Sequence, residues 1–145
     1  MSLKETLEKS FETYAGMTIM DRAICDARDC LKPSARMSMY AQFIEKITPD
    51  KPYRKSQKSV SAAMDHFYVH GDAPAYQTFA RMGKPFAMRY MLEDFQGITG
   101  TITEPHDEAA SRYTEMRLAP IAMKLFEHIE KETIAKWHEN YSGEE

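Results

Sequence analysis

Two adjacent residues, Arg112 and Tyr113, could carry out nucleophilic chemistry on a phosphate group. A tyrosine phenol can attack phosphorus and hold the product as an ester of energy similar to the phosphodiester that it replaces. Because its ordinary pKa is about 10, the phenol needs a base or electrostatic help at neutral pH. A neighbouring guanidinium stabilises negative charge that builds on phosphate oxygens. From residue types alone, an aromatic ring packed beside a hairpin is the commoner explanation of Tyr113.

The charge of the chain is unevenly distributed. Residues 22–92 carry twelve Lys or Arg against six Asp or Glu, although the formal net charge of the whole chain is −3. A basic middle can supply the sequence-independent attraction to phosphates that dominates DNA affinity. The same charges spread around a solvated surface would have no such role, so charge alone leaves both interpretations open.

Composition indicates one globular domain. The chain has 145 residues, of which 43 % are hydrophobic and 28 % charged, and no stretch approaches the roughly 20 apolar residues of a membrane helix. The N-terminal residues lack the pattern of a signal peptide. Cys25 and Cys30 match no common zinc spacing and are interpreted as reduced thiols. We expect a cytoplasmic, nucleoid-associated protein without membrane contact.

Apolar spacing predicts a mainly helical chain with a small β wing. Lys32-Pro33 opens one helix, and Asp72 is the expected N-cap of another. Helices are predicted over residues 3–23, 33–47, 56–67, 72–82 and 120–137, and a β-hairpin over residues 95–104. The expected buried positions are Met37, Tyr40, Ala41, Ile44 and Ile47, then Val60, Ala63, Met64 and Phe67, then Ala75, Phe79 and Met82. This order of elements is that of a CAP-like winged helix-turn-helix.

Five runs of residues resemble the A subunits of type IIA DNA topoisomerases, DNA gyrase and topoisomerase IV. They are DRAICDARDCLKPSAR (21–36), YRKSQKSV (53–60), HGDAPAYQTFARM (70–82), PFAMRYMLEDFQG (85–97) and AASRYTEMRLAPIA (109–122). The runs keep the family order and spacing from about residue 10 onward. The resemblance implies an N-terminal helical arm over residues 1–23 and a winged-helix DNA-cleavage domain over residues 24–145. The family's tower, coiled-coil gate and C-terminal domain are expected to be absent.

The resemblance also implies roles for individual residues. Tyr113 matches the nucleophile that forms a transient 5′-phosphotyrosyl link, and Arg112 matches the arginine at the scissile phosphate. Six further positions match residues that contact or lie near the DNA: Arg22, Lys32, Arg36, Lys55, His70 and Arg81. Their alternative roles are solvated surface charge and, for His70, a helix cap. The chain departs from the family at Cys30, Ala35, Met37 and Tyr68.

Cofactors and partners follow from the same resemblance. Mg²⁺ and ATP are both expected on a separate B subunit with toprim and ATPase domains, and no metal site is expected here, because Asp26 and Asp29 around Arg28 look structural. The partners would be duplex DNA, the B subunit, and a second copy of this chain in a homodimer through the DNA gate. Ala73 and Gln77 match the two side chains that hold quinolone drugs.

Two other functions remain open from the residues alone. A non-enzymatic winged-helix DNA-binding protein fits the pattern equally well but has no need of Arg112 and Tyr113. A helical protein-interaction module, with the basic stretch as a soluble face, is the second alternative. The sequence does not distinguish gyrase from topoisomerase IV.

Overall fold

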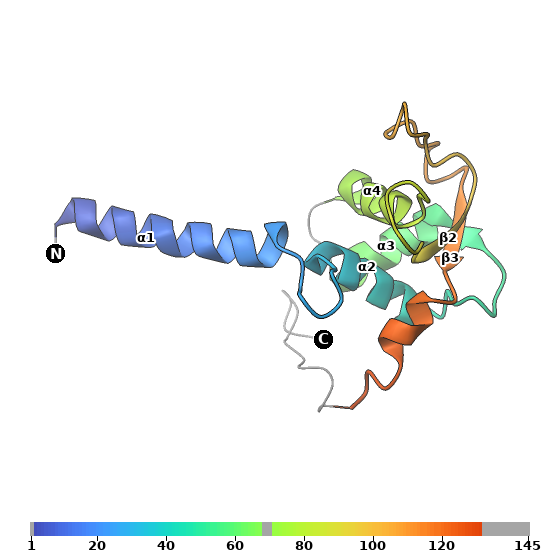
Figure 1. The fold of residues 1–145 in the computed structure, drawn as a ribbon, viewed down its shortest axis with the longest axis horizontal. Coiled ribbons are helices and arrows are strands. Elements are labelled where there is room, and N and C mark those ends of the chain that lie inside the picture. Colours follow the sequence, from blue (N-terminus) through green and yellow to red (C-terminus); the bar gives the residue numbers. More distant parts are fainter. Residues whose placement is uncertain (1, 68–70, 132–145) are drawn as a thin grey trace.

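The first helix stands apart from the rest of the molecule as an arm. The computed structural model describes residues 2–67 and 71–131. Helix α1 (Leu3–Thr18) begins with a capping box between Ser2 and Glu5 and continues through the π-turn η1 (Ile19–Ala23). Figure 1 shows α1 projecting from the globular body. Its apolar side chains Leu3, Leu7, Phe11, Tyr14 and Met17 are 60–77 % exposed, so the body provides no packing for this helix.

The globular body combines three helices with a small antiparallel sheet (Figure 1). Its elements are α2 (Pro33–Ile44), β1 (Arg54–Lys55), α3 (Ser56–His66), α4 (Asp72–Met82), β2 (Glu93–Gln96), β3 (Glu115–Leu118) and the 3₁₀ helix η2 (Ala122–Phe126). The sheet has the order β1-β3-β2, with Lys55 opposite Glu115 and Phe95 opposite Met116. Mainly helical structure with a small sheet, whose strands β2 and β3 follow the helix-turn-helix α3–α4, confirms the predicted winged-helix class. Among the described residues, no helix is long and apolar enough to cross a membrane.

The core lies between the three helices and β3. Phe79, Met39, Met116 and Leu118 are almost completely inaccessible to solvent. An aromatic cluster of Tyr40, Phe43, Phe67 and Phe126 closes one end of the core. The buried faces predicted for α3 and α4 are confirmed, since Val60, Ala63, Ala75, Phe79 and Met82 are buried and Met64 and Phe67 pack against them.

The buried face predicted for α2 is partly wrong. Met37 and Ile44 are 40 % and 38 % exposed, whereas Ser38 and Gln42 are fully buried. The Gln42 amide nitrogen donates to the Ser59 hydroxyl at 3.0 Å. Because Ser38 and Gln42 are four residues apart, they lie on one side of the helix, and α2 turns this polar side toward α3.

The predicted hairpin over residues 95–104 is also wrong. Strand β2 ends at Gln96 and pairs with β3, so residues 97–114 form one long loop with an isolated bridge between Thr99 and Glu108. Ile98 and Ile102, whose alternation suggested a strand, are 64 % and 78 % exposed. The partner of β2 is therefore non-local, which a short alternating run cannot reveal.

Several helix ends differ from the sequence-based prediction, since α2 ends at Ile44 instead of residue 47 and α3 ends at His66 instead of residue 67. Gly71, with φ of 96°, is the N-cap of α4, and Asp72 is the first helical residue. The long helix predicted over residues 120–137 is wrong as far as residue 131, because η2 ends at Phe126 and His128 has a positive φ of 63°. Its remaining part, including Ile134 and Trp137, lies outside the described residues.

Candidate active site

Tyr113 lies at the last position of a tight turn and is separated from β3 by Thr114 alone. The side chain is 69 % exposed, and its backbone N–H donates to the Ala110 carbonyl at 2.8 Å. The guanidinium carbon of Arg112 is 4.8 Å from the centre of the Tyr113 ring, within the range of a cation–π contact. The structure thus presents a phenol to solvent with a permanent positive charge beside it.

The N-terminus of α3 holds the turn that carries Tyr113. The Ser56 N–H donates to the Thr114 carbonyl at 3.0 Å, and the Gln57 N–H donates to the Ser111 carbonyl at 3.2 Å. The Ser111 hydroxyl also donates to the Gln57 side-chain oxygen. The first N–H groups of a helix have no acceptor within the helix. Here carbonyl groups in and beside the turn are their acceptors.

A chain of buried hydroxyls crosses behind Tyr113. The Thr114 hydroxyl is 2.8 Å from that of Ser56 and 2.9 Å from that of Tyr76. The Tyr76 hydroxyl donates to the carbonyl of Ala109. Ser56 and Thr114 are fully buried, so these contacts are shielded from competing water.

Gly97 lets the start of the long loop pass close to Thr114. Its φ of 122° lies in the region that favours glycine, and a Cβ atom there would be 2.8 Å from the Thr114 Cγ2 atom. A side chain at position 97 would therefore strain the backbone and also push against the residue that follows Tyr113.

The predicted basic residues differ in their surroundings. Lys55 is brought close to the turn, because β1 pairs with β3 and the Lys55 ammonium is 2.9 Å from the Glu115 carboxylate. Lys32, the N-cap of α2, and Arg81, in the last turn of α4, are exposed and form no ion pair within residues 2–67 and 71–131. Arg22 lies in the π-turn next to the arm.

Arg36 forms ion pairs with two aspartates, Asp26 and Asp29. Its guanidinium is 2.7 Å from Asp29 and 3.5 Å from Asp26, and Asp26 also accepts from Arg28. Hydrogen bonds from Arg28 hold the pKa of Asp26 well below its usual range. Both aspartates are thus engaged in ion pairs with arginines, and a phosphate would have to compete with them for Arg36. His70 lies outside the described residues.

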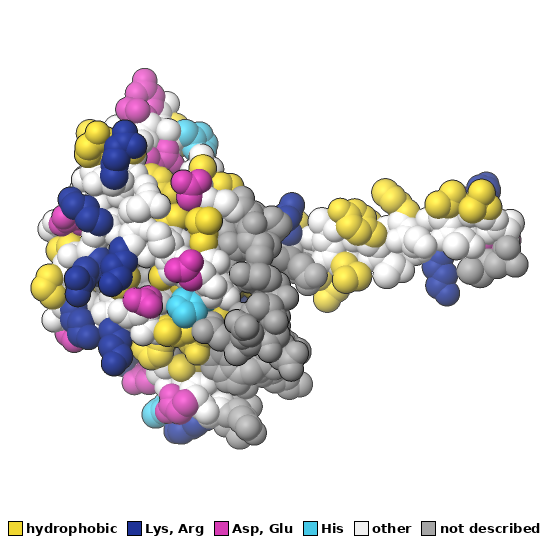
Figure 2. Space-filling model, turned by 180° about the vertical axis from the view of Figure 1, so that it is seen from behind, with side chains coloured by type: hydrophobic (Ala, Val, Ile, Leu, Met, Phe, Trp, Pro, Cys, Tyr) yellow, Lys and Arg dark blue, Asp and Glu magenta, His cyan; other side chains and the backbone are white. Residues whose placement is uncertain are grey.

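Helix α4 exposes the drug-site equivalents and partly buries Tyr76. Ala73 and Gln77 are exposed, whereas Tyr76 is partly buried and Ala75 and Phe79 are completely buried. Figure 2 shows Lys and Arg side chains gathered in a band along the side of the body that lies away from the arm. An exposed basic band of this kind can follow a phosphate backbone.

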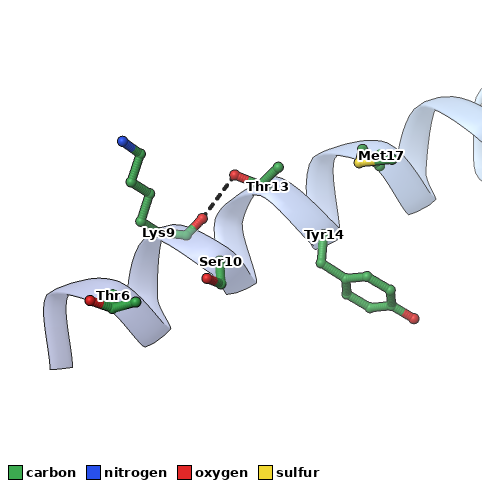
Figure 3. Close-up of a pocket in the computed structure, with 6 residues that line it drawn as sticks. All are labelled: Thr6, Lys9, Ser10, Thr13, Tyr14 and Met17. Carbon is green, nitrogen blue, oxygen red and sulfur yellow. Dashed lines mark hydrogen bonds between the residues drawn. The ribbon is translucent and has the colours of Figure 1, made fainter. Parts of the chain in front are cut away.

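Neither a metal cluster nor an enclosed pocket accompanies Tyr113 in the described ranges. No group of three His, Cys, Asp or Glu side chains there could hold a metal ion. One surface hollow is lined by residues of α1 alone: Thr6, Lys9, Ser10, Thr13, Tyr14 and Met17. Figure 3 shows that these residues follow a single helix, joined by one bond from the Thr13 hydroxyl to the Lys9 carbonyl. This hollow is an open helix side rather than a substrate pocket.

The sequence patterns did not single out several of these contacts. Tyr76, Ser56, Gln57 and Thr114 all lie within the five motif runs, yet neither spacing nor residue type indicated that they meet. The sequence offered one indication, which is that a hydroxyl residue directly follows two of the candidate site residues. Ser56 follows Lys55, and Thr114 follows Tyr113.

Comparisons with known proteins give a consistent result. Residues 22–145 match the family of DNA gyrase/topoisomerase IV A subunits. The chain is 42 % identical over 92 % of its length to the DNA gyrase A subunit of Brachyspira hyodysenteriae. Over its whole length it is 42 % identical to that of Mycoplasma genitalium and 41 % identical to that of Escherichia coli. The chain spans only 16–17 % of the length of these relatives.

Proposed function

This chain belongs to the family of DNA gyrase and topoisomerase IV A subunits, and we propose that it is the segment of such a subunit that binds duplex DNA and cuts it through Tyr113. The observation that supports this best is the pairing of an exposed phenol with Arg112 on a turn held by both α3 and α4. A regulator that only binds DNA has no use for such an arrangement.

The proposed reaction is a reversible transfer of a phosphodiester bond. The Tyr113 oxygen forms a bond to phosphorus while the bond from phosphorus to the 3′ oxygen breaks. The phenol proton passes to solvent, and the 3′ oxygen takes up a proton. Because one phosphodiester replaces another of similar energy, resealing can proceed by the reverse of each step. Arg112 would stabilise charge on the phosphate oxygens during the transfer.

The basic residues would position the duplex. Lys and Arg contacts to phosphates fix register without reading the bases, which suits an enzyme that acts at many sites. Lys55 lies beside the turn through its pairing with Glu115, and Lys32 and Arg81 are available on α2 and α4. Arg22 and His70 complete the proposed set, and Arg36 would exchange its aspartates for phosphate.

Other chains would supply the rest of the enzyme. We assign ATP hydrolysis and Mg²⁺ to the B subunit; when bound, the ion polarises phosphate oxygens and stabilises the leaving oxygen. The exposed apolar side of α1 leaves a surface on which another polypeptide can pack. A second copy of the chain would cut the opposite strand, with the exposed side chains of Phe86, Tyr90 and Met91 near the two-fold contact.

The test is to replace Tyr113 by phenylalanine in the A subunit that carries this segment and to assay it with the B subunit on plasmid DNA. Denaturant-trapped protein–DNA adducts should form with the wild type and disappear with Tyr113→Phe, while DNA binding stays unchanged. Tyr53→Phe is the control, because it removes a tyrosine hydroxyl that lies outside both the turn and α1. Adducts that persist in Tyr113→Phe would refute the assignment.

A further inference from the structure

Tyr76 reaches from α4 to both ends of the segment that carries Arg112 and Tyr113. Its hydroxyl donates to the Ala109 carbonyl and lies 2.9 Å from the Thr114 hydroxyl. Ala109 precedes the turn and Thr114 follows Tyr113 directly. One hydroxyl group therefore holds both ends of the segment that carries the exposed phenol.

We propose that Tyr76 is a positioning residue for DNA cleavage, whose hydroxyl fixes the place of the Tyr113 oxygen relative to the scissile phosphate. The proposal rests on the proposed function, since it presumes that Tyr113 is the nucleophile. Tyr76 itself touches neither DNA nor the reacting atoms in this role and acts through Ala109 and Thr114.

The surroundings of Tyr76 suit a fixed hydrogen-bond donor. Its ring packs against Phe95 of β2 with ring centres 6.3 Å apart, which restricts the side chain. Burial raises the pKa of Tyr76 above its ordinary value, so the hydroxyl keeps its proton at any physiological pH. It can therefore serve as a permanent donor to Ala109 and has no role as a general base.

The opposite side of the turn is held independently by α3. Ser56 and Gln57 bind the Thr114 and Ser111 carbonyls, and the Ser56 hydroxyl joins the Thr114 hydroxyl at 2.8 Å. The turn is thus suspended between the two helices of the helix-turn-helix. A movement of α4 relative to α3 can reach Tyr113 through Tyr76, because in the described part of the chain this α4 side chain is bonded to Ala109 and Thr114, on either side of the turn.

Loss of the Tyr76 hydroxyl should slow the chemical step more than it affects folding. The ring and its packing remain in Tyr76→Phe, and the Thr114 hydroxyl retains Ser56 as a partner. The Ala109 carbonyl loses its donor, and the turn gains freedom. Misplacement of a reacting group by about 1 Å can lower a rate by roughly 100-fold, and we expect about a tenfold loss for this smaller change.

The experiment combines the A and B subunits with a duplex whose scissile 3′ oxygen is replaced by sulfur. Attack by Tyr113 then forms the oxygen–phosphorus bond, breaks the phosphorus–sulfur bond and releases a thiol that reseals poorly. The rate constant at saturating DNA reports positioning, whereas the final amount of adduct reports the fraction of competent enzyme. Tyr76→Phe should lower the rate constant about tenfold and leave the amount of adduct and the Kd for DNA unchanged.

The matched control is Tyr53→Phe, which removes a hydroxyl whose pKa is raised by the nearby Asp94 and which is not bonded to the turn in the described residues. Its rate constant should equal that of the wild type. Thr114→Val removes the other half of the contact while conserving side-chain shape, and it should slow cleavage as well. If both act through the same contact, the double variant with Tyr76→Phe should be less impaired than the product of the two single effects.

The outcomes separate the two proposals. A Tyr76→Phe enzyme with the wild-type rate constant, or with a reduced amount of adduct at the wild-type rate constant, would overturn the positioning role and leave the proposed function standing. A wild-type enzyme without any adduct, or adduct formation by Tyr113→Phe, would overturn the proposed function and the positioning role with it.

Discussion

The ammonium of Lys84 lies 3.1 Å from the carboxylate of Glu108, and the two side chains are only 5 % and 7 % exposed. Lys84 follows α4, and Glu108 belongs to the long loop that leads to Tyr113. The same ammonium donates to the Pro105 carbonyl. This buried ion pair therefore ties the middle of the loop to the end of α4.

Replacing only one residue of this ion pair should lower the free energy of unfolding substantially. Lys84→Met leaves the Glu108 carboxylate buried without its partner, which typically costs about 3–5 kcal/mol. Replacing both residues, with Lys84→Met and Glu108→Leu, should recover most of that loss, because no buried charge remains. Urea unfolding of the single and double variants measures this. A single variant as stable as the wild type would show that the pair contributes little.

A second prediction concerns a buried carboxyl group in the core. Glu93 is 1 % exposed, and its two carboxylate oxygens, the Gln42 carbonyl oxygen and the Ser38 hydroxyl have no hydrogen-bond partner within the described residues. Burial raises the pKa of Glu93 well above 4.5, and the nearby charge of Asp94 raises it further. A protonated Glu93 can donate to the Gln42 carbonyl, whereas a carboxylate cannot.

The stability of the folded chain should therefore fall as pH rises. A raised pKa in the folded state stabilises the protein fully below the ordinary value of 4.5, and this stabilisation is lost as pH rises toward the folded-state pKa. Over that window the free energy of unfolding should fall by up to about 1.4 kcal/mol per pH unit. Glu93→Gln keeps a donor without a titrating proton, so it should remove the slope and be more stable than the wild type at neutral pH.

Urea midpoints across the pH range check this, with Glu12→Gln as a control. Glu12 is exposed on α1, so its replacement should leave the wild-type slope intact. A Glu93→Gln protein that is less stable than the wild type at neutral pH would contradict a neutral Glu93.

A third prediction compares one substitution at two glycines. Gly97→Ala should destabilise the chain by about 1–3 kcal/mol, because φ is unfavourable for alanine and its Cβ would press on Thr114. Gly16→Ala, near the end of α1 with no atom within 4 Å of the added Cβ, should instead favour the helix by up to about 1 kcal/mol. Urea unfolding measures the first effect, and helical circular dichroism measures the second. Equal effects at the two positions would refute the conformational argument.

The helices were predictable because their apolar spacing is a local signal. The faces of α3 and α4 follow from residues three or four positions apart, and burial of Val60 and Phe79 agrees with that pattern. The face of α2 was not predictable, because Ser38 and Gln42 are fully buried although polar, and Gln42 bonds to Ser59 on another helix. The strand partner of β2 and the end of η2 likewise depend on distant packing.

The candidate site also has one part that the sequence predicted and one part that it did not. Arg112 and Tyr113 were identified from a motif that is contiguous in sequence. The groups that hold them are not contiguous, since Tyr76 is 33 residues from Ala109 and Ser56 is 58 residues from Thr114. Hydrogen bonds over such separations leave no periodic trace in the sequence, so the hydroxyl chain could be found only once the fold was known.

The last prediction concerns quinolone drugs and the exposed side of α4. In the family that the chain resembles, the drug is held through a magnesium ion whose waters bind a serine or threonine and an acidic residue four positions later. The corresponding residues here are Ala73 and Gln77, both exposed near the start of α4. Alanine has no hydroxyl, and glutamine keeps an acceptor without a charge. Because a charge-assisted hydrogen bond is about twice as strong as a neutral one, both drug contacts should be weakened.

We therefore expect the wild-type enzyme to be poorly trapped by quinolones and Ala73→Ser combined with Gln77→Glu to become sensitive. The α4 side chain bonded to the segment around Tyr113 in the described residues is Tyr76, not Ala73 or Gln77, so cleavage without drug should be unaffected. Drug-stimulated linearisation of plasmid DNA compares the wild type, each single variant and the double variant. The single variants should respond in part, because each restores one of the two contacts. Strong linearisation by the wild type at ordinary drug concentrations, or a double variant no more sensitive than the wild type, would show that these two positions do not determine the drug response.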